Sequence, residues 1–211
     1  MRTHGVTPQV EAAARAAGVE VLDATCPYVK KAHLAAERLK RDGYQVVIVG
    51  EKGHPEVEGT LGHAPGALVI NDASELDGVE VARRVGVVVQ TTQTRACLSE
   101  VVTRLLGMAE ETRVINTICA ATTERQNAAA ELSARADVMV VIGGRNSANT
   151  THLAEICAAH CAHTHHIETA DELEPAWFQG MGLIGITAGA STPGDQIESV
   201  RARIAELTRN E

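Results

Sequence analysis

Aromatic residues are scarce in this sequence: they make up 2% of its 211 residues. The four are Tyr28, Tyr44, Trp177 and Phe178. Stacking of nucleic-acid bases on aromatic platforms is therefore excluded as a general binding mode, and the core has to consist of Ala, Val, Ile and Leu. A net charge of −8 argues against a general surface for nucleic acid or anionic membranes. It remains compatible with a small basic pocket for one anion.

Long apolar runs and export signals are also missing. No run approaches the roughly 20 apolar residues that a membrane-spanning helix needs, and the first residues are not typical of a signal peptide. We therefore expect a cytoplasmic protein. Five cysteines, an odd number, then indicate thiols or metal ligands rather than a disulfide framework.

Three common motifs are absent from the chain: the P-loop, Gly-x-Gly-x-x-Gly and Gly-x-Ser-x-Gly. Nucleotide hydrolysis, the usual dinucleotide-binding fingerprint and serine esterase chemistry lose support accordingly.

Short apolar runs rich in β-branched residues predict strands that are covered on both faces. They lie at 19–22, 45–49, 85–89, 113–115, 137–142 and 183–186. Ala-rich amphipathic stretches between them predict helices at 8–17, 29–41, 98–108, 123–135, 151–159 and 196–208. Alternating strands and helices predict an α/β fold with parallel sheets.

The chain contains an internal repeat with an offset of 93 residues, the separation of Cys26 and Cys119. Each cysteine precedes a predicted helix and a strand that ends in glycine, at Gly50 and Gly143. A second type of half-unit places His4, Thr91 and Ser191 in equivalent turns. Because ligands bind beyond the carboxyl ends of strands in open α/β sheets, these turns predict one convergent pocket. The repeat also predicts a missing N-terminal half-unit, since the chain opens at Thr3-His4-Gly5.

Several residues in these turns are candidates for chemistry, and each also has a purely structural interpretation. Cys26 and Cys119 are candidate metal ligands, including ligands of an iron–sulfur cluster, or small buried residues. His54 could hold an anion and Glu56 could deliver a proton, or both could lie in a solvated loop. Ser147 and Asn149 suit a helix cap, an anion site, or both.

The segment from Cys157 to His166 has four histidines and two cysteines, but it spans a predicted helix end and a loop, so we favour a structural role. Cys97 begins a helix close to Thr91. Core packing is the simpler interpretation, and mild activation of the thiol near the pocket is the alternative.

Seven blocks, taken together and in order, resemble the 4-hydroxy-3-methylbut-2-enyl diphosphate reductase family. They are Thr-His4-Gly-Val, Asp-Ala-Thr-Cys26-Pro, Gly-His54-Pro-Glu56-Val-Glu-Gly-Thr, Gln-Thr91-Thr92, Thr-Ile-Cys119 with Ala-Thr-Thr-Glu-Arg-Gln, Asn146-Ser147-x-Asn149, and Thr-Ala-Gly-Ala-Ser191-x-Pro. The His54 block is the most specific of them.

The resemblance implies a pseudo-threefold arrangement of small parallel α/β domains around a [4Fe-4S] cluster. It assigns Cys26 and Cys119 as cluster ligands, Glu56 as the proton relay and Thr91 as a hydroxyl on the substrate side. The remaining matches are diphosphate-binding residues: His4, His54, Ser147, Asn149 and Ser191. The implied reaction yields isopentenyl and dimethylallyl diphosphates in non-mevalonate isoprenoid synthesis, with electrons from ferredoxin or flavodoxin.

The resemblance also implies an incomplete first domain. The family's motif Gly-Phe-Cys-Ala-Gly-Val, which carries the third cysteine ligand, is absent, as is an early histidine; both are expected upstream of Met1. We expect a remnant of the first domain at 1–25, a second domain at 26–118, a third at 119–190, and a helix at 191–211 that returns to the first. Such a chain would be an impaired or inactive reductase. The alternative is a short paralogue that binds diphosphate, or acts as a scaffold, without redox chemistry.

Overall fold

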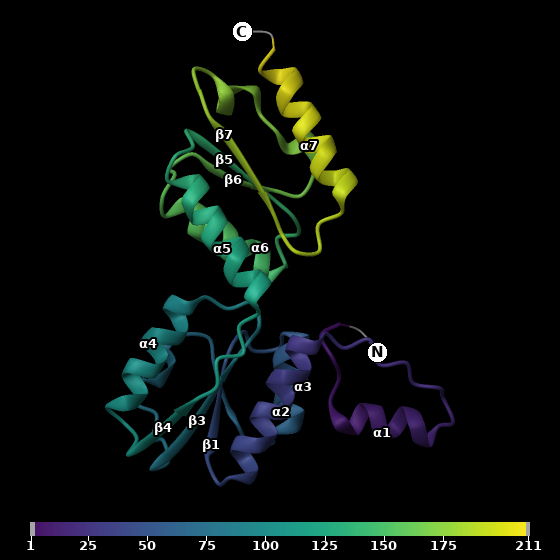
Figure 1. Ribbon diagram of the computed structural model, residues 1–211, viewed down its shortest axis with the longest axis vertical. Coiled ribbons are helices and arrows are strands. Elements are labelled where there is room, and N and C mark those ends of the chain that lie inside the picture. The colour runs from purple at the N-terminus through teal and green to yellow at the C-terminus, as the bar shows by residue number, and fades with distance from the viewer. Residues whose placement is uncertain (1–2, 210–211) are drawn as a thin grey trace. The chain divides into compact units, whose positions relative to one another are not determined.

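The computed structural model describes residues 3–209. The chain forms two compact units, Met1–Cys119 and Ala120–Glu211, and each is built on a parallel sheet (Figure 1). The predicted α/β fold with parallel sheets is therefore confirmed. The division into three domains stays a prediction.

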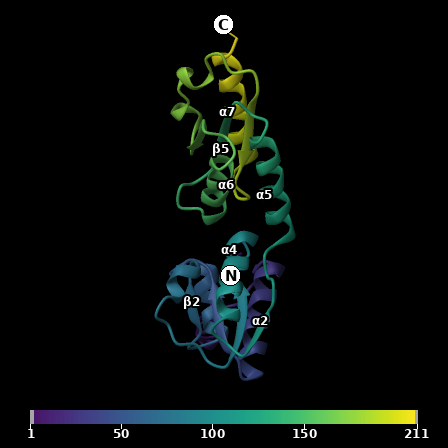
Figure 2. The same ribbon diagram turned by 90° about the vertical axis from the view of Figure 1, so that its left-hand side faces the viewer.

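The first unit carries a four-stranded sheet of order β2-β1-β3-β4, with every neighbouring pair parallel. Its elements are α1 (Pro8–Ala16), α2 (Pro27–Arg41), β1 (Gln45–Val49), α3 (Pro55–His63), β2 (Leu68–Ile70), the 3-10 helix η1 (Ala73–Leu76), β3 (Arg84–Val89), α4 (Arg95–Leu106) and β4 (Glu111–Val114). The short strand β2 forms one edge of this sheet (Figure 2).

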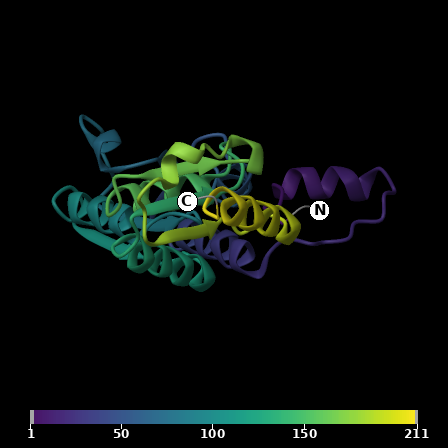
Figure 3. The same ribbon diagram turned by 90° about the horizontal axis from the view of Figure 1, so that it is seen from above.

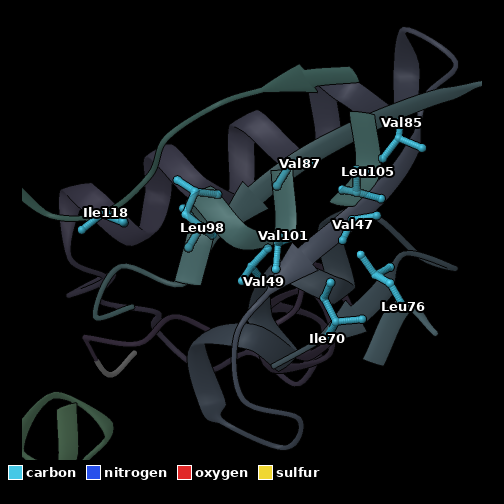
Figure 4. Close-up of a cluster of buried hydrophobic side chains, with 11 residues drawn as sticks. Val47, Val49, Ile70, Leu76, Val85, Val87, Leu98, Val101, Leu105 and Ile118 are labelled. Carbon is cyan, nitrogen blue, oxygen red and sulfur yellow. The ribbon is translucent and has the colours of Figure 1, made fainter. Parts of the chain in front are cut away.

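Successive residues of β1 point to opposite faces of the sheet, as the two-residue period of a strand requires. Val47 and Val49 pack with Leu98 and Val101 of α4, in the cluster drawn in Figure 4. Ile48 and its neighbours on the other face pack against α2 and α3. Burial on both faces explains why the strand sequence is apolar without alternation.

The second unit carries a three-stranded parallel sheet of order β6-β5-β7. Its elements are α5 (Ala120–Ser133), β5 (Val138–Ile142), α6 (Ala148–Ala158), β6 (Thr164–Ile167), the 3-10 helices η2 (Ala170–Glu172) and η3 (Pro175–Phe178), β7 (Ile184–Ala188) and α7 (Gly194–Leu207). Helices α5 and α6 pack on one face of the sheet and α7 packs on the other (Figure 1). The return of 191–211 to a first domain stays a prediction.

The internal repeat is visible in both units. Helices α2 and α5 begin directly after Cys26 and Cys119, and β1 and β5 begin at Gln45 and Val138, again 93 residues apart. In each sheet the first strand is central and the second and third flank it. The two units are therefore copies of one α/β plan.

One predicted strand, Val19–Leu22, is wrong, because these residues form neither helix nor strand. Val19 is 58% exposed and Leu22 is 81% exposed, so no core covers their side chains. The preceding helix α1 has no buried residue, and this segment stands apart from the sheet of its unit (Figures 1 and 3). The apolar character of this run therefore did not predict its burial or its secondary structure.

Among the described residues, no helix combines the length and the apolar character that crossing a bilayer requires.

Candidate functional site

The predicted site residues follow the carboxyl ends of strands or precede helices. His54 is the N-cap of α3, just after β1, and Ser147 is the N-cap of α6, just after β5. Thr91 follows β3, and Cys26 and Cys119 precede α2 and α5. A helix N-terminus presents free N–H groups and the positive end of a dipole, so these positions favour anions and thiolates.

Cys26 is tied to the turn that carries His4. The backbone N–H of Cys26 donates to the carbonyl oxygen of Thr3 at 2.9 Å. His4 in turn meets the His54 ring edge-on, with ring centroids 5.2 Å apart and an interplanar angle of 67°. Two histidines from distant parts of the chain are thus paired, and two imidazoles can donate hydrogen bonds to one anion.

The N-terminus of α3 joins His54 to Glu56. The Nδ1 atom of His54 accepts a hydrogen bond from the backbone N–H of Glu56 at 3.2 Å. Because Nδ1 is the acceptor, the ring's remaining nitrogen, Nε2, is the one that can donate to a ligand. Capping by His54 therefore fixes the tautomer that an anion site needs.

Glu56 is only 2% exposed, yet it forms no ion pair with a side chain of residues 3–209. Its Oε1 accepts from the backbone N–H of Thr91 at 2.6 Å, and its Oε2 accepts from the Thr91 hydroxyl at 2.8 Å. Burial raises the pKa of this carboxyl, and the two hydrogen bonds from Thr91 oppose that rise. A carboxyl whose pKa is raised can hold a proton closer to neutral pH than an ordinary glutamate.

Thr91 completes the connection to Cys119. Its carbonyl oxygen accepts from the backbone N–H of Cys119 at 3.0 Å. A continuous series of contacts therefore runs from the backbone of Cys26 through the Thr3–His4 turn, His54, Glu56 and Thr91 to the backbone of Cys119. All the predicted site residues of the first unit belong to this series.

Gln90 is a site residue that the sequence analysis missed. Its Oε1 accepts from the backbone N–H of Glu51 at 2.9 Å, and its Nε2 donates to the Thr92 hydroxyl at 3.0 Å. The side chain packs against Gly50, where a Cβ would lie 2.6 Å from Oε1. Gln90 thus ties the loop that leads to His54 to the loop of Thr91. The place of Gln90, a polar residue directly after a predicted buried strand, could have identified it from the sequence.

In the second unit, Asn149 is buried without a partner. It is 6% exposed, and neither its Oδ1 nor its Nδ2 has a hydrogen bond. Ser147, the N-cap of the same helix, makes no side-chain cap bond. A buried amide without partners costs free energy unless a ligand satisfies it, so the start of α6 has the chemistry of a ligand site.

Ser191 is exposed and lies in the loop between β7 and α7. This loop is held close to α6, because Gly189 contacts the Thr150 side chain so tightly that a Cβ could not be accommodated. The Thr192 hydroxyl also donates to the carbonyl oxygen of Ile142 at the end of β5, at 3.0 Å. The loop that carries Ser191 is therefore fixed to the start of α6, which carries Asn149.

The other cysteines have packing roles. Cys157 and Cys161 are buried in a core cluster of the second unit. Cys97 packs against the core of the first, and burial raises the pKa of its thiol to about 11. Both observations favour the packing interpretation of Cys97 over an activated thiol. Cys26 and Cys119 are half-buried. Among residues 3–209, no group of three or more His, Cys, Asp or Glu side chains is arranged to hold a metal ion.

The histidines near Cys161 also have structural partners. His165 stacks on Trp177, with ring centroids 3.7 Å apart, and a ring nitrogen of His166 lies 2.9 Å from the carbonyl oxygen of Gly143. Both residues belong to β6, where the sequence analysis had placed a loop.

Comparison with known proteins identifies the family. The model of the family described as "LytB protein" matches residues 1–205. The chain is 47% identical to a protein of Aquifex aeolicus over 211 residues, covering 98% of this chain and 73% of that protein. It is 49% identical to one of Geobacter sulfurreducens, covering 98% of this chain and 74% of that protein. Both relatives are named 4-hydroxy-3-methylbut-2-enyl diphosphate reductase.

Two solved structures are similar as well. One, of (E)-4-hydroxy-3-methyl-but-2-enyl diphosphate reductase, is 48% identical, with a TM-score of 0.65 over 97% of this chain and 74% of that one. The other, of the E-1-hydroxy-2-methyl-but-2-enyl-4-diphosphate reductase from Plasmodium falciparum, is 26% identical, with a TM-score of 0.89 over 95% of this chain and 64% of that one. The family model and these identities agree, and the chain belongs to the LytB protein family.

Proposed function

We propose that this chain is an iron–sulfur reductase that converts 4-hydroxy-3-methylbut-2-enyl diphosphate to isopentenyl and dimethylallyl diphosphates, and that the 211 residues alone turn over slowly or not at all. The observation that carries the proposal is the series of contacts from Cys26 to Cys119, with a buried carboxyl at its centre. Family membership supports it, because the relatives are named for this reaction.

Diphosphate binding is assigned to His4, His54, Ser147, Asn149 and Ser191. A diphosphate carries several negative charges, so a protein of net charge −8 has to concentrate donors locally to hold it. The paired His4 and His54 rings supply two donors in the first unit. The unpartnered amide of Asn149 supplies a donor that no protein group satisfies. Ser147 and Ser191 add hydroxyl groups.

Proton delivery is assigned to Glu56, with Thr91 as its partner. The reaction removes a hydroxyl group as water, which requires a proton at the leaving oxygen. The raised pKa of Glu56 suits it to hold that proton. The Thr91 hydroxyl donates to Glu56 and can itself accept from a substrate hydroxyl, so it can join the carboxyl to the reacting oxygen.

A [4Fe-4S] cluster with one open iron would take three thiolates in this family and would supply the electrons and a Lewis-acid site. Cys26 and Cys119 fit two of these positions, since both are half-buried thiols at the start of helices. Residues 3–209 offer no third cysteine beside them, because Cys97, Cys157 and Cys161 pack in hydrophobic cores. The described residues therefore do not fit a complete cluster.

We further propose ferredoxin or flavodoxin as the electron donor and the cytoplasm as the compartment. Both follow from the family resemblance. Reduction of the substrate requires two electrons from outside the chain, which a small redox protein would deliver.

The two-thiol arrangement favours a second candidate, a diphosphate-binding or scaffold module without redox chemistry. It would keep the donors around His54 and Asn149 and have no use for Cys26 and Cys119. Anaerobic reconstitution with iron and sulfide separates the two candidates. For a reductase short of one ligand, we expect a labile cluster, below stoichiometry, that Cys26→Ala and Cys119→Ala abolish and Cys97→Ala does not.

Calorimetry with inorganic pyrophosphate tests the binding site that both candidates share. The chain should bind pyrophosphate, and His54→Ala and Asn149→Ala should each weaken the binding. A stable, stoichiometric cluster would contradict the inference that these residues lack a third cluster ligand. If iron uptake does not depend on Cys26 or Cys119, the diphosphate-binding module is favoured. If the chain does not bind pyrophosphate, both candidates are overturned.

A further inference from the structure

His33 is a buried residue to which the proposed function assigns no role. It lies on α2, is 5% exposed, and its Nε2 has no hydrogen-bond partner. One face of its ring stacks on His63 of α3, with centroids 4.4 Å apart and an interplanar angle of 23°. Because no hydrogen bond from residues 3–209 holds Nε2, this edge of the ring is placed by packing and by the stack on His63.

The edge of the His33 ring faces two glycines from different segments. A Cβ on Gly5 would lie 2.7 Å from Cε1 of His33, and a Cβ on Gly59 would lie 3.1 Å from Nε2. The ring therefore fills the space between the turn of Gly5 and the helix of Gly59. Any larger residue at either position would have to displace it.

These two glycines belong to the segments that carry the paired histidines. Gly5 follows His4, and Gly59 lies in α3, whose N-cap is His54. The carbonyl oxygen of His4 is itself 3.5 Å from the Cβ position of Gly59. One turn further along α3, a Cβ on Gly62 would lie 2.6 Å from Cβ of Thr7. The N-terminal turn is thus seated on a glycine face of α3.

We propose that His33 is a positioning residue: its ring, held between Gly5 and Gly59, sets the separation of the His4 and His54 rings that bind the diphosphate. This inference rests on the proposed function for the identity of the ligand, whereas the geometry of the two rings is independent of it. His33 touches no ligand atom in this proposal and acts through His4.

The neutral form of His33 suits this role. Burial and the neighbouring His63 lower the pKa of His33 to about 4, so the ring carries no charge near neutral pH. A neutral, flat ring can lie between two backbone segments without a counterion, whereas a charged one would require a partner.

Gly59→Ala tests the proposal, with Gly107→Ala as its matched control. Alanine favours a helix more than glycine does, so Gly59→Ala should not weaken α3 itself. A Cβ on Gly107, at the end of α4, would meet only ordinary van der Waals contact, 3.5 Å from the Arg104 oxygen. Two signals are measured on the 211-residue chain: the nuclear Overhauser effect between the His4 and His54 ring protons, and the affinity for inorganic pyrophosphate.

We expect Gly59→Ala to displace the His33 ring by a few tenths of an ångström and so to weaken the ring-to-ring signal. We expect it to weaken pyrophosphate binding by up to about tenfold, the effect of misplacing one charge-assisted donor. Gly107→Ala should change neither. The double variant His33→Ala/Gly59→Ala should bind no more weakly than His33→Ala alone, because the methyl group then occupies the space left by the ring. Additive losses would instead show that the two residues affect binding independently.

The proposal is overturned if Gly59→Ala leaves the ring-to-ring signal unchanged. It is also overturned if the losses in pyrophosphate affinity caused by His33→Ala and Gly59→Ala are additive. If the unsubstituted chain binds no pyrophosphate, the proposed function fails, and the ring-to-ring signal still decides whether His33 positions His4. If Gly59→Ala does not fold, His33→Ala is compared with Leu34→Ala, its exposed neighbour on α2, for the same signal. Retention of the signal in His33→Ala overturns the proposal.

Discussion

The carboxylate of Glu56 accepts two hydrogen bonds from a single residue, one from the backbone N–H of Thr91 and one from its hydroxyl. The carboxyl is nearly fully buried and no cation lies among the causes of its pKa shift. Thr91 alone therefore offsets part of the cost of burying this group. The protonation of Glu56 depends on a contact between the loop after β3 and the start of α3.

Glu56→Gln should change how stability depends on pH. The pKa of Glu56 in the folded chain is raised above its ordinary value of 4.5. The stability that this raised pKa contributes to the free energy of unfolding is fully present below pH 4.5 and is lost as the pH rises through the folded pKa. Glutamine keeps the shape and does not ionise. We expect the variant to gain stability relative to the original chain as the pH rises from 4.5, by about 1.4 kcal/mol per unit of pKa shift. Urea unfolding across this range measures the gain, and a constant difference would contradict the raised pKa.

Thr91→Val removes the hydroxyl and keeps the backbone donor. We expect it to destabilise the chain by about 1–3 kcal/mol, because one oxygen of a buried carboxylate loses its partner. The pKa of Glu56 should rise further, so the loss should grow with pH. Thr103→Val, on the exposed side of α4, is the control and should stay within about 0.5 kcal/mol. Equal losses for the two variants in chemical denaturation would refute a special role for Thr91.

Asn149→Ala should separate stability from binding. It removes a buried amide that has no partner, so the free chain should melt at the same temperature or higher. Pyrophosphate binding should weaken by about tenfold or more, since a charge-assisted hydrogen bond is lost. Asn127→Ala, at an exposed position of α5, measures the gain from helix propensity alone. A clear fall in melting temperature for Asn149→Ala would show that its amide is already satisfied.

Thiol labelling should distinguish exposure from reactivity. Cys26, Cys97 and Cys119 are all partly exposed, but burial raises the pKa of Cys97 to about 11. The thiolate is the reactive form, so Cys97 should be labelled slowly by iodoacetamide at pH 7.5. Peptide mass spectrometry over time should show Cys97 reacting well after Cys26 and Cys119. Rapid labelling of Cys97 would contradict its packed position.

The strong strands and the long helices could be predicted from the sequence because each has a clear pattern. Val47 to Val49 are apolar on both faces, and the helix at Pro27–Arg41 has an amphipathic period. Short edge elements lack such a pattern: Leu68–Ile70 is only three residues long and half-buried. This strand forms because it pairs with β1, a contact that the short sequence of the strand itself does not predict.

Helix α3, which carries part of the site, was also difficult to predict from a sequence pattern alone. The segment from His54 could be taken for a loop, because it is rich in glycine and charge. His54 followed by Pro55 is nevertheless an N-cap followed by the preferred first helical residue. The site residues were predicted from the repeat and the motifs, whereas Gln90 and His33 act by filling space beside glycines. Such contacts depend on tertiary packing and leave no period in the sequence.

The boundary at Cys119 has a consequence for how the protein is made. The first unit holds its whole sheet, both of its core clusters and the link from Glu56 to Thr91 within residues that precede the second unit in the chain. Domains generally fold as units during synthesis, N-terminal first. We therefore expect Glu56 to be buried and held by Thr91 while part of the second unit is still being synthesised.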